Sequence, residues 1–362
     1  MHAASTDFSF HFRTFAPSLS VPYMTIHKEA SLRAYNTFGI DATASLLAEF
    51  ASVEELRELL QNTEVQALPK LILGGGSNVL FTQDVEAAVL LNRIKGVIQT
   101  EEPDGKHVLV TSGSGETWHD LVLYTLEHDL GGIENLSLIP GTVGAAPLQN
   151  IGAYGVELKD TFVSLEALEI ATGEVVSFNK EQCGFGYRES VFKKEAKGKY
   201  IVTSVTLRLT KEHTFNTSYG AIQDTLNQQE VKELSLKAIS EAVCHIRRSK
   251  LPDPAKIGNA GSFFKNPEIP LALFEILKSQ YPGIPGYPVT PESVKVPAGW
   301  LIEQCGWKGK VLGQHGVHKD QALVLVNYGG AAGNDVKTLA YEIIKSVDEK
   351  FGIALTPEVN II

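Results

Sequence analysis

The chain has 362 residues, 43% of them apolar, which is enough to bury a sizeable core and to form two or three domains. Its formal net charge of −10 argues against a general nucleic-acid binder, because such proteins normally present a basic face. No apolar run reaches the length of a membrane span, and the N-terminal segment lacks the basic start and apolar stretch of an export signal.

The three cysteines, Cys183, Cys244 and Cys305, are isolated in the sequence. Neither a CxxC pair nor a disulfide framework is present, so we expect a reducing compartment, a cytoplasmic location and no structural metal.

The chain begins with residues 1–24, which show no helical or strand periodicity and are expected to form an extension. Residues 25–92 are predicted to form a β-α-β-β unit. Its first strand leads to Ser52, and Glu55 stands three residues later, as in the capping box of a helix. A strand, a glycine-rich loop and a short apolar strand follow.

Residues 93–237 are predicted to form a second unit with a helix stopped by Gly131 and Gly132, a hairpin around Thr172 and Gly173, and a half-buried strand in "YIVTSVTLRLT". Residues 238–362 are predicted to form a third unit. It opens on the helical pattern "ELSLKAISEAVCHIRRSK" and closes on a strand in "QALVLVNY", a long helix and a final strand in "IALTPEVNII".

A first glycine-rich loop follows a predicted strand, where backbone N–H groups can approach a phosphate without obstruction by side chains. It comprises Gly74, Gly75, Gly76, Ser77 and Asn78. The next residues read as a strand, and neither GxGxxG spacing nor a GK[ST] triplet is present, which excludes Rossmann and Walker loops. A tight turn without a ligand is the alternative.

A second glycine-rich segment runs from Gly131 to Gly155. Long structureless loops are uncommon in compact domains unless they bind something, although a surface loop without function is the alternative. Its small residues would let the backbone lie against a flat ring, and its amides could supply hydrogen bonds. The small residues are Gly141, Thr142, Gly144 and Ala145, and the amides are Gln149 and Asn150.

The succession "LGGGSNVLF", "GIENLSLIPGTVGAAPLQNIGAYGVEL", "GYRES", "KLPDP", "GNAGSFFKNP" and "TPEV" resembles the type I UDP-N-acetylenolpyruvoylglucosamine reductase (MurB) family, from about Asn36 to Glu358. The resemblance implies an α+β fold. This is a two-subdomain FAD-binding fold of the vanillyl-alcohol oxidase/PCMH type plus a C-terminal α+β substrate domain. It also implies noncovalent FAD, with Gly74 to Asn78 on the pyrophosphate and Pro140 to Gln149 near the isoalloxazine.

The resemblance implies three catalytic residues. Arg188 would clamp the substrate carboxylate and stabilise negative charge, Ser262 would donate a proton, and Glu358 would assist near Ser262. Without the resemblance, each of these residues reads as an ordinary surface, turn or strand position. Tyr187 would line the substrate pocket or serve in packing.

Basic residues cluster before "LPDP" and again after Ser262, and such charges are usually a solvated face. The resemblance instead assigns Lys250 and Asn266 to the diphosphate of a UDP-sugar. It further assigns Tyr219 as a mobile tyrosine that closes over the diphosphate, and Gln321 as a nucleotide contact.

The reaction implied by the resemblance is the NADPH-dependent, FAD-mediated reduction of UDP-N-acetylglucosamine enolpyruvate to UDP-N-acetylmuramate, a step in peptidoglycan precursor synthesis. Two alternatives stay open: an oxidase on the same FAD scaffold, and a UDP-sugar-binding module without catalysis. NADPH and the UDP-sugar are the expected partners, with no nucleic acid and no membrane. The oligomeric state is open, with a monomer among the alternatives.

Overall fold

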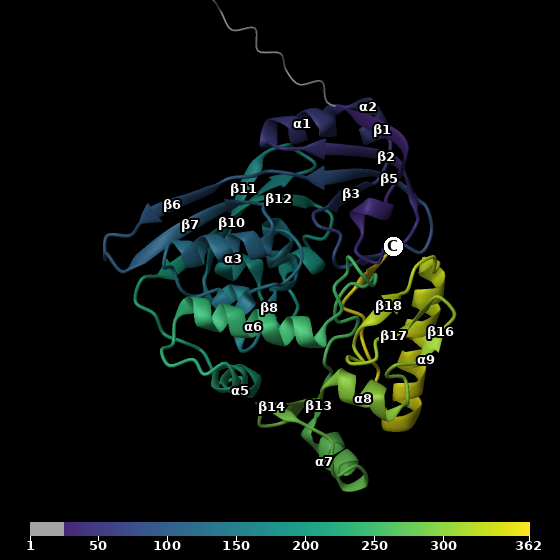
Figure 1. The fold of residues 1–362 in the computed structure, drawn as a ribbon. Coiled ribbons are helices and arrows are strands. Elements are labelled where there is room, and N and C mark those ends of the chain that lie inside the picture. The colour runs from purple at the N-terminus through teal and green to yellow at the C-terminus, as the bar shows by residue number, and fades with distance from the viewer. Residues whose placement is uncertain (1–24) are drawn as a thin grey trace, which may run out of the picture.

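A computed structural model describes residues 25–362. The expected N-terminal extension, residues 1–24, lies outside the described residues. Among residues 25–362, no helix is both long and apolar enough to cross a bilayer. The described chain mixes helices and strands around several small sheets (Figure 1), as the α+β prediction requires.

The first sheet has the strand order β1-β2-β5-β3, with β1 antiparallel and the other pairs parallel. Apolar residues of α1 pack on one face of this sheet. The elements are β1 (Ile26–Ser31), β2 (Thr43–Phe50), α1 (Val53–Gln61), α2 (Thr63–Gln66), β3 (Lys70–Leu73), β4 (Val79–Leu80) and β5 (Val85–Asn92).

The predicted β-α-β-β order was incomplete, because β1 and β5 also belong to this sheet. The short strand β4 lies outside it and pairs in parallel with β19 (Asn360–Ile361) near the C-terminus. The capping box is also only half formed. Ser52 Oγ accepts from the Glu55 N–H at 3.1 Å, but the Glu55 carboxylate accepts from the Ala51 N–H instead of that of Ser52.

The second sheet is antiparallel, in the order β11-β10-β12-β7-β6, and α3 packs its apolar residues against one face. The predicted hairpin around Thr172 and Gly173 is confirmed by the pairing of β10 with β11. The elements are β6 (Val97–Glu101), β7 (His107–Gly113), α3 (Trp118–Glu127), β8 (Gly152–Ala153), β9 (Val156–Glu157), β10 (Phe162–Glu169), β11 (Val175–Asn179), α4 (Lys180–Cys183) and β12 (Tyr200–Thr210).

The end of α3 differs from the prediction. The helix stops at Glu127, and the residue that takes the left-handed conformation is Asp129, with φ 56°. Gly131 instead forms a bridge to Thr210 at the end of β12, because its N–H donates to the Thr210 carbonyl at 2.8 Å. The helix thus ends before the two glycines, and Gly131 pairs with the sheet.

The remaining elements form two small sheets flanked by helices. Helices α5 and α6 pack on each other through an apolar cluster. The elements are α5 (Gly220–Gln228), α6 (Leu236–Lys250), β13 (Glu268–Pro270), α7 (Leu271–Gln280), β14 (Tyr287–Thr290), β15 (Ser293–Lys295), α8 (Ala298–Gln304), β16 (Val311–Leu312), β17 (His315–Val317), β18 (Leu325–Asn327) and α9 (Gly333–Phe351).

The C-terminal part of the chain shares a buried core with the first sheet, and Figure 1 shows the C-terminus between the two. Phe38 meets Phe263 edge to face at 6.3 Å, and Asn327 Nδ2 donates to the Phe38 carbonyl at 2.9 Å. The expected final strand is only β19, so Glu358 lies in irregular chain before it and not in a strand. The boundaries placed at residues 92 and 237 stay predictions.

Candidate active site

The two glycine-rich segments lie against each other. A Cβ on Gly75 would stand 3.3 Å from Gly141 Cα, and a Cβ on Gly74 would overlap Thr142 Oγ1. Gly141 has φ 110°, and a Cβ there would lie 3.0 Å from Ser77 Oγ. The missing side chains therefore permit a backbone-to-backbone contact between segments that are far apart in the sequence.

Gly76 fixes the shape of the first loop. Its φ is 60°, its carbonyl accepts from the Thr37 N–H at 3.1 Å, and a Cβ would overlap the Tyr35 carbonyl oxygen. Within the described chain, the N–H groups of Gly75, Gly76 and Ser77 make no hydrogen bond to other protein groups. A loop of unpaired N–H groups, two of them on glycines, fits the pyrophosphate of FAD.

The second segment is tied to the end of β7. The Val143 N–H donates to the Glu116 carbonyl, and the Gly144 N–H donates to the Ser114 carbonyl, both at 2.8 Å. A Cβ on Gly144 would meet Ser114 Cβ at 2.6 Å, so the close approach requires glycine. Pro140 and Ala145 remain exposed. The segment thus presents a fixed, small-residue surface, which fits the face of a flat ring.

Gln149 and Asn150 have different surroundings. Gln149 Oε1 accepts from Asn78 Nδ2 at 2.9 Å and lies 3.4 Å from Lys193 Nζ. Asn150 is fully buried, donates to Glu157 and to the Gly186 carbonyl at 3.0 Å, and accepts from the Lys159 N–H at the same distance. Its amide holds the segment to the "GYRES" loop, and a direct flavin contact stays a prediction.

Arg188 occupies a tight turn between Gly186 and Glu189, whose backbones form a bridge. Its φ of 54° lies in the left-handed region, which few non-glycine residues adopt. Residues held in this conformation cluster at functional sites. The guanidinium donates to the Gly152 carbonyl at 2.5 Å through Nη2 and pairs with Glu358 Oε1 at 3.2 Å through Nε. Both side chains are largely buried, with 19% and 15% exposure.

Burial raises the pKa of Glu358, and the positive charges of Arg188, Lys193 and Lys265 partly oppose this rise. Burial lowers the pKa of Lys193, and the nearby charge of Lys265 lowers it further. Arg188 and Lys193 therefore lie beside the Glu358 carboxyl group, while Lys265 is paired with Glu189 at 2.7 Å, and the two cations beside Glu358 suit an anionic substrate.

Ser262 is exposed and lies one residue before Phe263, whose carbonyl accepts from the Glu358 N–H at 2.8 Å. The structure therefore places the chain around Ser262 alongside that around Glu358, which in turn contacts Arg188. The three predicted catalytic residues lie on adjacent segments. Their roles stay predictions.

Asn266 and Gln321 both lie beside the start of α8. Asn266 Oδ1 accepts from the Ala298 N–H at 2.9 Å, and a Cβ on Gly299 would lie 3.3 Å from Gln321 Oε1. The pKa of the neighbouring Tyr187 is raised mainly by burial, and Asn266 is among the groups that lower it. Asn266 therefore lies near the turn that carries Tyr187 and Arg188.

Tyr219 and Lys250 lie elsewhere. Tyr219 precedes α5, is 51% exposed and packs edge to face on Tyr154 at 5.3 Å. Lys250 is exposed at the C-terminal end of α6. Within the described chain, neither side chain forms a hydrogen bond or ion pair with the Arg188 turn, and their predicted diphosphate contacts stay predictions.

Two residues near the site were missed by sequence reasoning. Lys193 contacts Gln149, and Lys295 places its Nζ 3.5 Å from the centre of the Tyr187 ring. The sequence around Lys193 ("KK") and Lys295 ("SVK") contains no motif that predicts these two contacts, because they arise only from tertiary packing.

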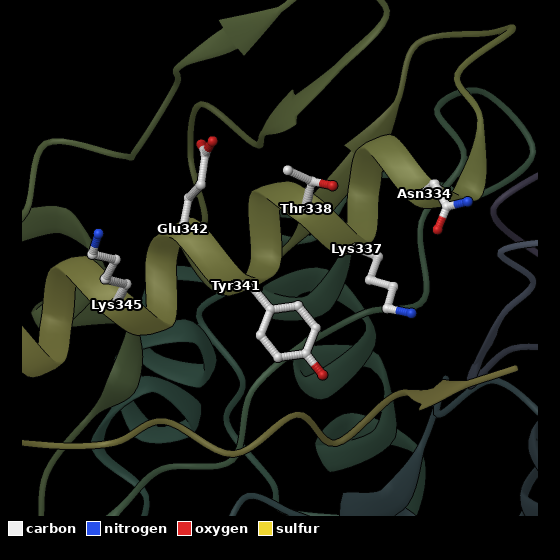
Figure 2. A pocket seen from close by; sticks show the side chains of 6 residues that line it. All are labelled: Asn334, Lys337, Thr338, Tyr341, Glu342 and Lys345. Carbon is white, nitrogen blue, oxygen red and sulfur yellow. The ribbon is translucent and has the colours of Figure 1, made fainter.

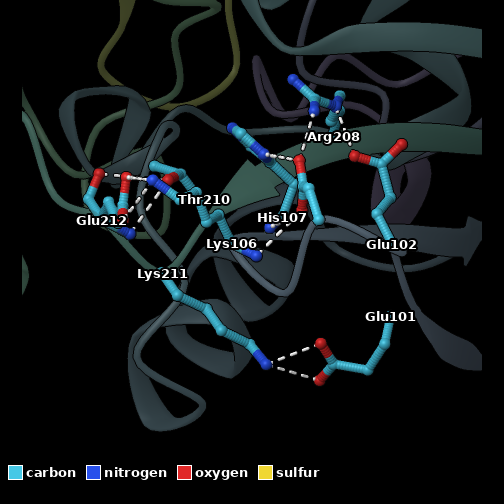
Figure 3. A network of polar contacts seen from close by, with 9 residues as sticks. Glu101, Glu102, Lys106, His107, Arg208, Thr210, Lys211 and Glu212 are labelled. Atoms are coloured by element: carbon cyan, nitrogen blue, oxygen red, sulfur yellow. Dashed lines mark hydrogen bonds and ion pairs between the residues drawn. The ribbon is translucent and has the colours of Figure 1, made fainter.

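Other polar groups lie apart from the site. A surface hollow of about 380 Å³ is lined entirely by residues of α9. Figure 2 shows these side chains along the helix. Figure 3 shows ion pairs at the β6–β7 hairpin, where Arg208 bonds both Glu102 and Asp104. Glu102, Asp104 and His107 could approach a cation, but Arg208 already neutralises their carboxylates.

The sequence profile of the FAD binding domain family matches residues 44–179, and that of the UDP-N-acetylenolpyruvoylglucosamine reductase C-terminal domain matches residues 253–362. A solved structure of UDP-N-acetylenolpyruvylglucosamine reductase from Thermus caldophilus has a TM-score of 0.64 and 24% identity, and the match covers 94% of this chain and 99% of that one. At this identity the likeness concerns the fold, which confirms the predicted FAD-binding scaffold with its C-terminal domain.

Curated relatives are closer in sequence. A UDP-N-acetylenolpyruvoylglucosamine reductase of Amoebophilus asiaticus is 53% identical over 339 residues, which covers 94% of this chain and 100% of the relative. One of Flavobacterium johnsoniae is 51% identical over 340 residues, with the same coverage. The chain therefore belongs to the UDP-N-acetylenolpyruvoylglucosamine reductase family.

Proposed function

We propose that the chain catalyses the NADPH-dependent reduction of UDP-N-acetylglucosamine enolpyruvate to UDP-N-acetylmuramate, with FAD as cofactor. Family membership over nearly the whole chain supports the activity. The observation that carries the assignment to a particular site is the buried Arg188–Glu358 pair beside the two joined glycine-rich segments.

The loop from Gly74 to Asn78 would hold the pyrophosphate of FAD through its unpaired N–H groups. The segment from Pro140 to Gln149 would lie against the isoalloxazine. FAD held there would supply the hydride transfer between NADPH and the enolpyruvyl double bond. The chain's own residues would then bind the substrate and manage the charge and proton that the reaction requires.

Arg188 would bind the substrate carboxylate through its guanidinium, because a planar fork matches a carboxylate better than a point charge does. The same group would stabilise the enolate that develops on the substrate after hydride addition. Its left-handed turn and its bond to the Gly152 carbonyl fix its direction before substrate arrives.

Glu358 and Ser262 would serve the proton transfer. Burial raises the pKa of Glu358, so its carboxyl group takes up a proton more readily than an exposed one does, and when protonated it would hydrogen-bond the enolate oxygen. Ser262 would protonate the adjacent carbon. A hydroxyl is a weak acid, but the enolate is a strong base, so the transfer is favourable.

The UDP part would lie toward the start of α8, beside Asn266 and Gln321, with Lys250 and Tyr219 as further diphosphate contacts. The three cysteines are free, as is usual in reducing compartments, which supports a cytoplasmic location.

The test is a two-step flavin titration of the purified protein. NADPH should bleach the flavin absorbance, and the enolpyruvyl UDP-sugar added without oxygen should restore it. Ser262→Ala should bleach normally but recover at least about 100-fold more slowly, as expected for loss of a proton donor. The exposed helix residue Ser279, changed to Ala, is the matched control and should behave like the parent. Normal recovery in Ser262→Ala would remove Ser262 from the mechanism, and no recovery in the parent would refute the function.

A further inference from the structure

The turn that carries Arg188 also carries a second charge. Gly186 and Glu189 exchange two backbone hydrogen bonds, of 3.0 and 3.3 Å, so Tyr187 and Arg188 are its two central residues. Arg188 is the third of the four residues of this turn. Its φ is positive, and a positive φ at this position favours glycine. A charged residue in that conformation persists only where neighbouring contacts hold it.

The facing structure is a pair of chain segments joined by backbone hydrogen bonds. The Glu358 N–H donates to the Phe263 carbonyl at 2.8 Å, and the Lys265 N–H donates to the Thr356 carbonyl at 2.9 Å. Lys265 and Glu358 therefore stand on one rigid unit. Ser262 belongs to the same unit.

Two ion pairs connect the turn to this unit. The turn supplies the cation in one pair and the anion in the other. Arg188 on the turn pairs with Glu358 on the unit at 3.2 Å, and Glu189 on the turn pairs with Lys265 on the unit at 2.7 Å. The second pair is the shorter, and its side chains are 18% exposed for Lys265 and 31% for Glu189. Lys194 also approaches Glu189, at 3.7 Å, but its side chain is 61% exposed.

The two pairs have different fates when an anionic substrate binds. Arg188 must share its guanidinium between Glu358 and the arriving carboxylate, which weakens the first pair. The Glu189–Lys265 pair would keep its partners, because the substrate carboxylate would bind Arg188, the charged residue of the two at the centre of the turn.

We propose that Glu189 and Lys265 are a positioning pair that holds the Arg188 turn in register with the Ser262–Glu358 unit while Arg188 changes partner. Neither residue needs to touch substrate in this role. The inference rests on the proposed function, since it concerns the substrate half of that reaction. Tyr187 adds a contact across the same boundary, with Lys295 Nζ 3.5 Å from its ring centre, but that contact involves one charge, whereas the Glu189–Lys265 contact joins two.

The test uses Glu189→Gln, Lys265→Met and the double variant, each as the FAD-loaded protein. NADPH-driven bleaching should stay within about twofold of the parent. Recovery with the enolpyruvyl UDP-sugar should slow by about 10- to 100-fold in each single variant, as expected when a positioned group shifts by about 1 Å. The double variant should be no slower than the slower single variant, because both changes remove the same contact.

Two controls separate positioning from folding. Lys194→Met removes the exposed partner of the same carboxylate and should recover like the parent. Lys265→Arg keeps the charge and should recover much faster than Lys265→Met, with thermal midpoints of all variants close to the parent.

Failure of the inference is distinguishable from failure of the function. If the parent does not recover with the UDP-sugar, the proposed function is wrong. If the parent recovers and the single variants recover within twofold of it, the positioning role is wrong. Equal slowing of bleaching and recovery, or fold-losses that multiply in the double variant, would also overturn the role.

Discussion

Asn78 Nδ2 donates to Gln149 Oε1 at 2.9 Å, and this bond joins the two glycine-rich segments across 71 residues of sequence. Asn78 also reaches the Glu358 carbonyl at 3.3 Å, while Gln149 lies 3.4 Å from Lys193. One amide pair thus connects the proposed pyrophosphate loop and the proposed ring-binding segment with the backbone of Glu358.

Gly76→Ala should destabilise the protein and remove FAD. The left-handed φ alone makes alanine unfavourable by about 1–2 kcal/mol, and the Cβ would in addition overlap the Tyr35 carbonyl oxygen. The loop must therefore move, and its N–H groups lose their common direction. Urea denaturation and the flavin absorbance of the purified protein measure the two effects.

Gly173→Ala is the matched control. Gly173 has φ 74°, but nothing lies within 4 Å of its Cβ position. The variant should lose about 1 kcal/mol and keep its flavin. If Gly76→Ala loses no more stability than Gly173→Ala and stays yellow, close packing at Gly76 does not support cofactor binding.

The local elements were predictable because their signals are local. Thr172 and Gly173 stand between two alternating apolar runs, and such a pattern predicts a hairpin at any place in a protein. Each glycine-rich segment could likewise be recognised from its own residues. The contact between Gly75 and Gly141 was not, because nothing in either segment specifies which distant backbone lies against it.

The conformation of the turn that carries Arg188 could not be predicted from the sequence, for a different reason. Arginine rarely adopts positive φ, so residue preferences argue against the conformation that Arg188 takes. The final strand was overextended because "IALTPEVNII" has strand composition. Only Asn360 and Ile361 find a partner strand, β4, which lies near the other end of the chain.

Arg188→Lys should bind FAD but lose most of its substrate chemistry. Lysine cannot bond the Gly152 carbonyl and the Glu358 carboxylate while presenting a planar fork to the substrate. We expect the recovery of reduced flavin with the enolpyruvyl UDP-sugar to slow by about 10²- to 10³-fold, the usual loss for a group that stabilises developing charge. Anaerobic stopped-flow absorbance measures it, and recovery within threefold of the parent would contradict the assignment.

Glu358→Gln should change stability in a pH-dependent way. Burial raises the pKa of Glu358 in the folded state, so the folded protein holds this proton more tightly than the unfolded chain. Its stabilising effect is therefore present at low pH, below the unfolded pKa, and is lost as pH rises through the folded pKa. The free energy of unfolding of the variant should therefore increase relative to that of the parent as pH rises.

Urea denaturation at several pH values between about 4.5 and 8 compares the two proteins, and the parent-minus-variant difference should fall over this range. A difference that instead rises with pH would show that the ion pair with Arg188 outweighs burial.

Asp104→Asn should have the opposite pH dependence at the β6–β7 hairpin. The Lys106 N–H donates to Asp104 Oδ1 at 2.8 Å, and this bond, followed by the contact with the His107 side chain, lowers the pKa of Asp104 to about 2. A depressed pKa gives stability that is present above the unfolded value of 3.8 and lost as pH falls toward 2. The parent should therefore exceed the variant in stability at pH 7, and the gap should narrow between about pH 5 and pH 3.

Glu101→Gln in the same region (Figure 3) is the control, because its pair with Lys211 has side-chain exposures of 62% and 42% and such pairs contribute little. Both variants should keep parental flavin content and turnover, since the hairpin contributes no residue to the proposed site. A gap between parent and Asp104→Asn that stays constant from pH 7 to pH 3 would mean that the lost Arg208 hydrogen bond, and not the ionisation of Asp104, causes the destabilisation. The hairpin would then be held by hydrogen-bond geometry, and acid would leave it intact.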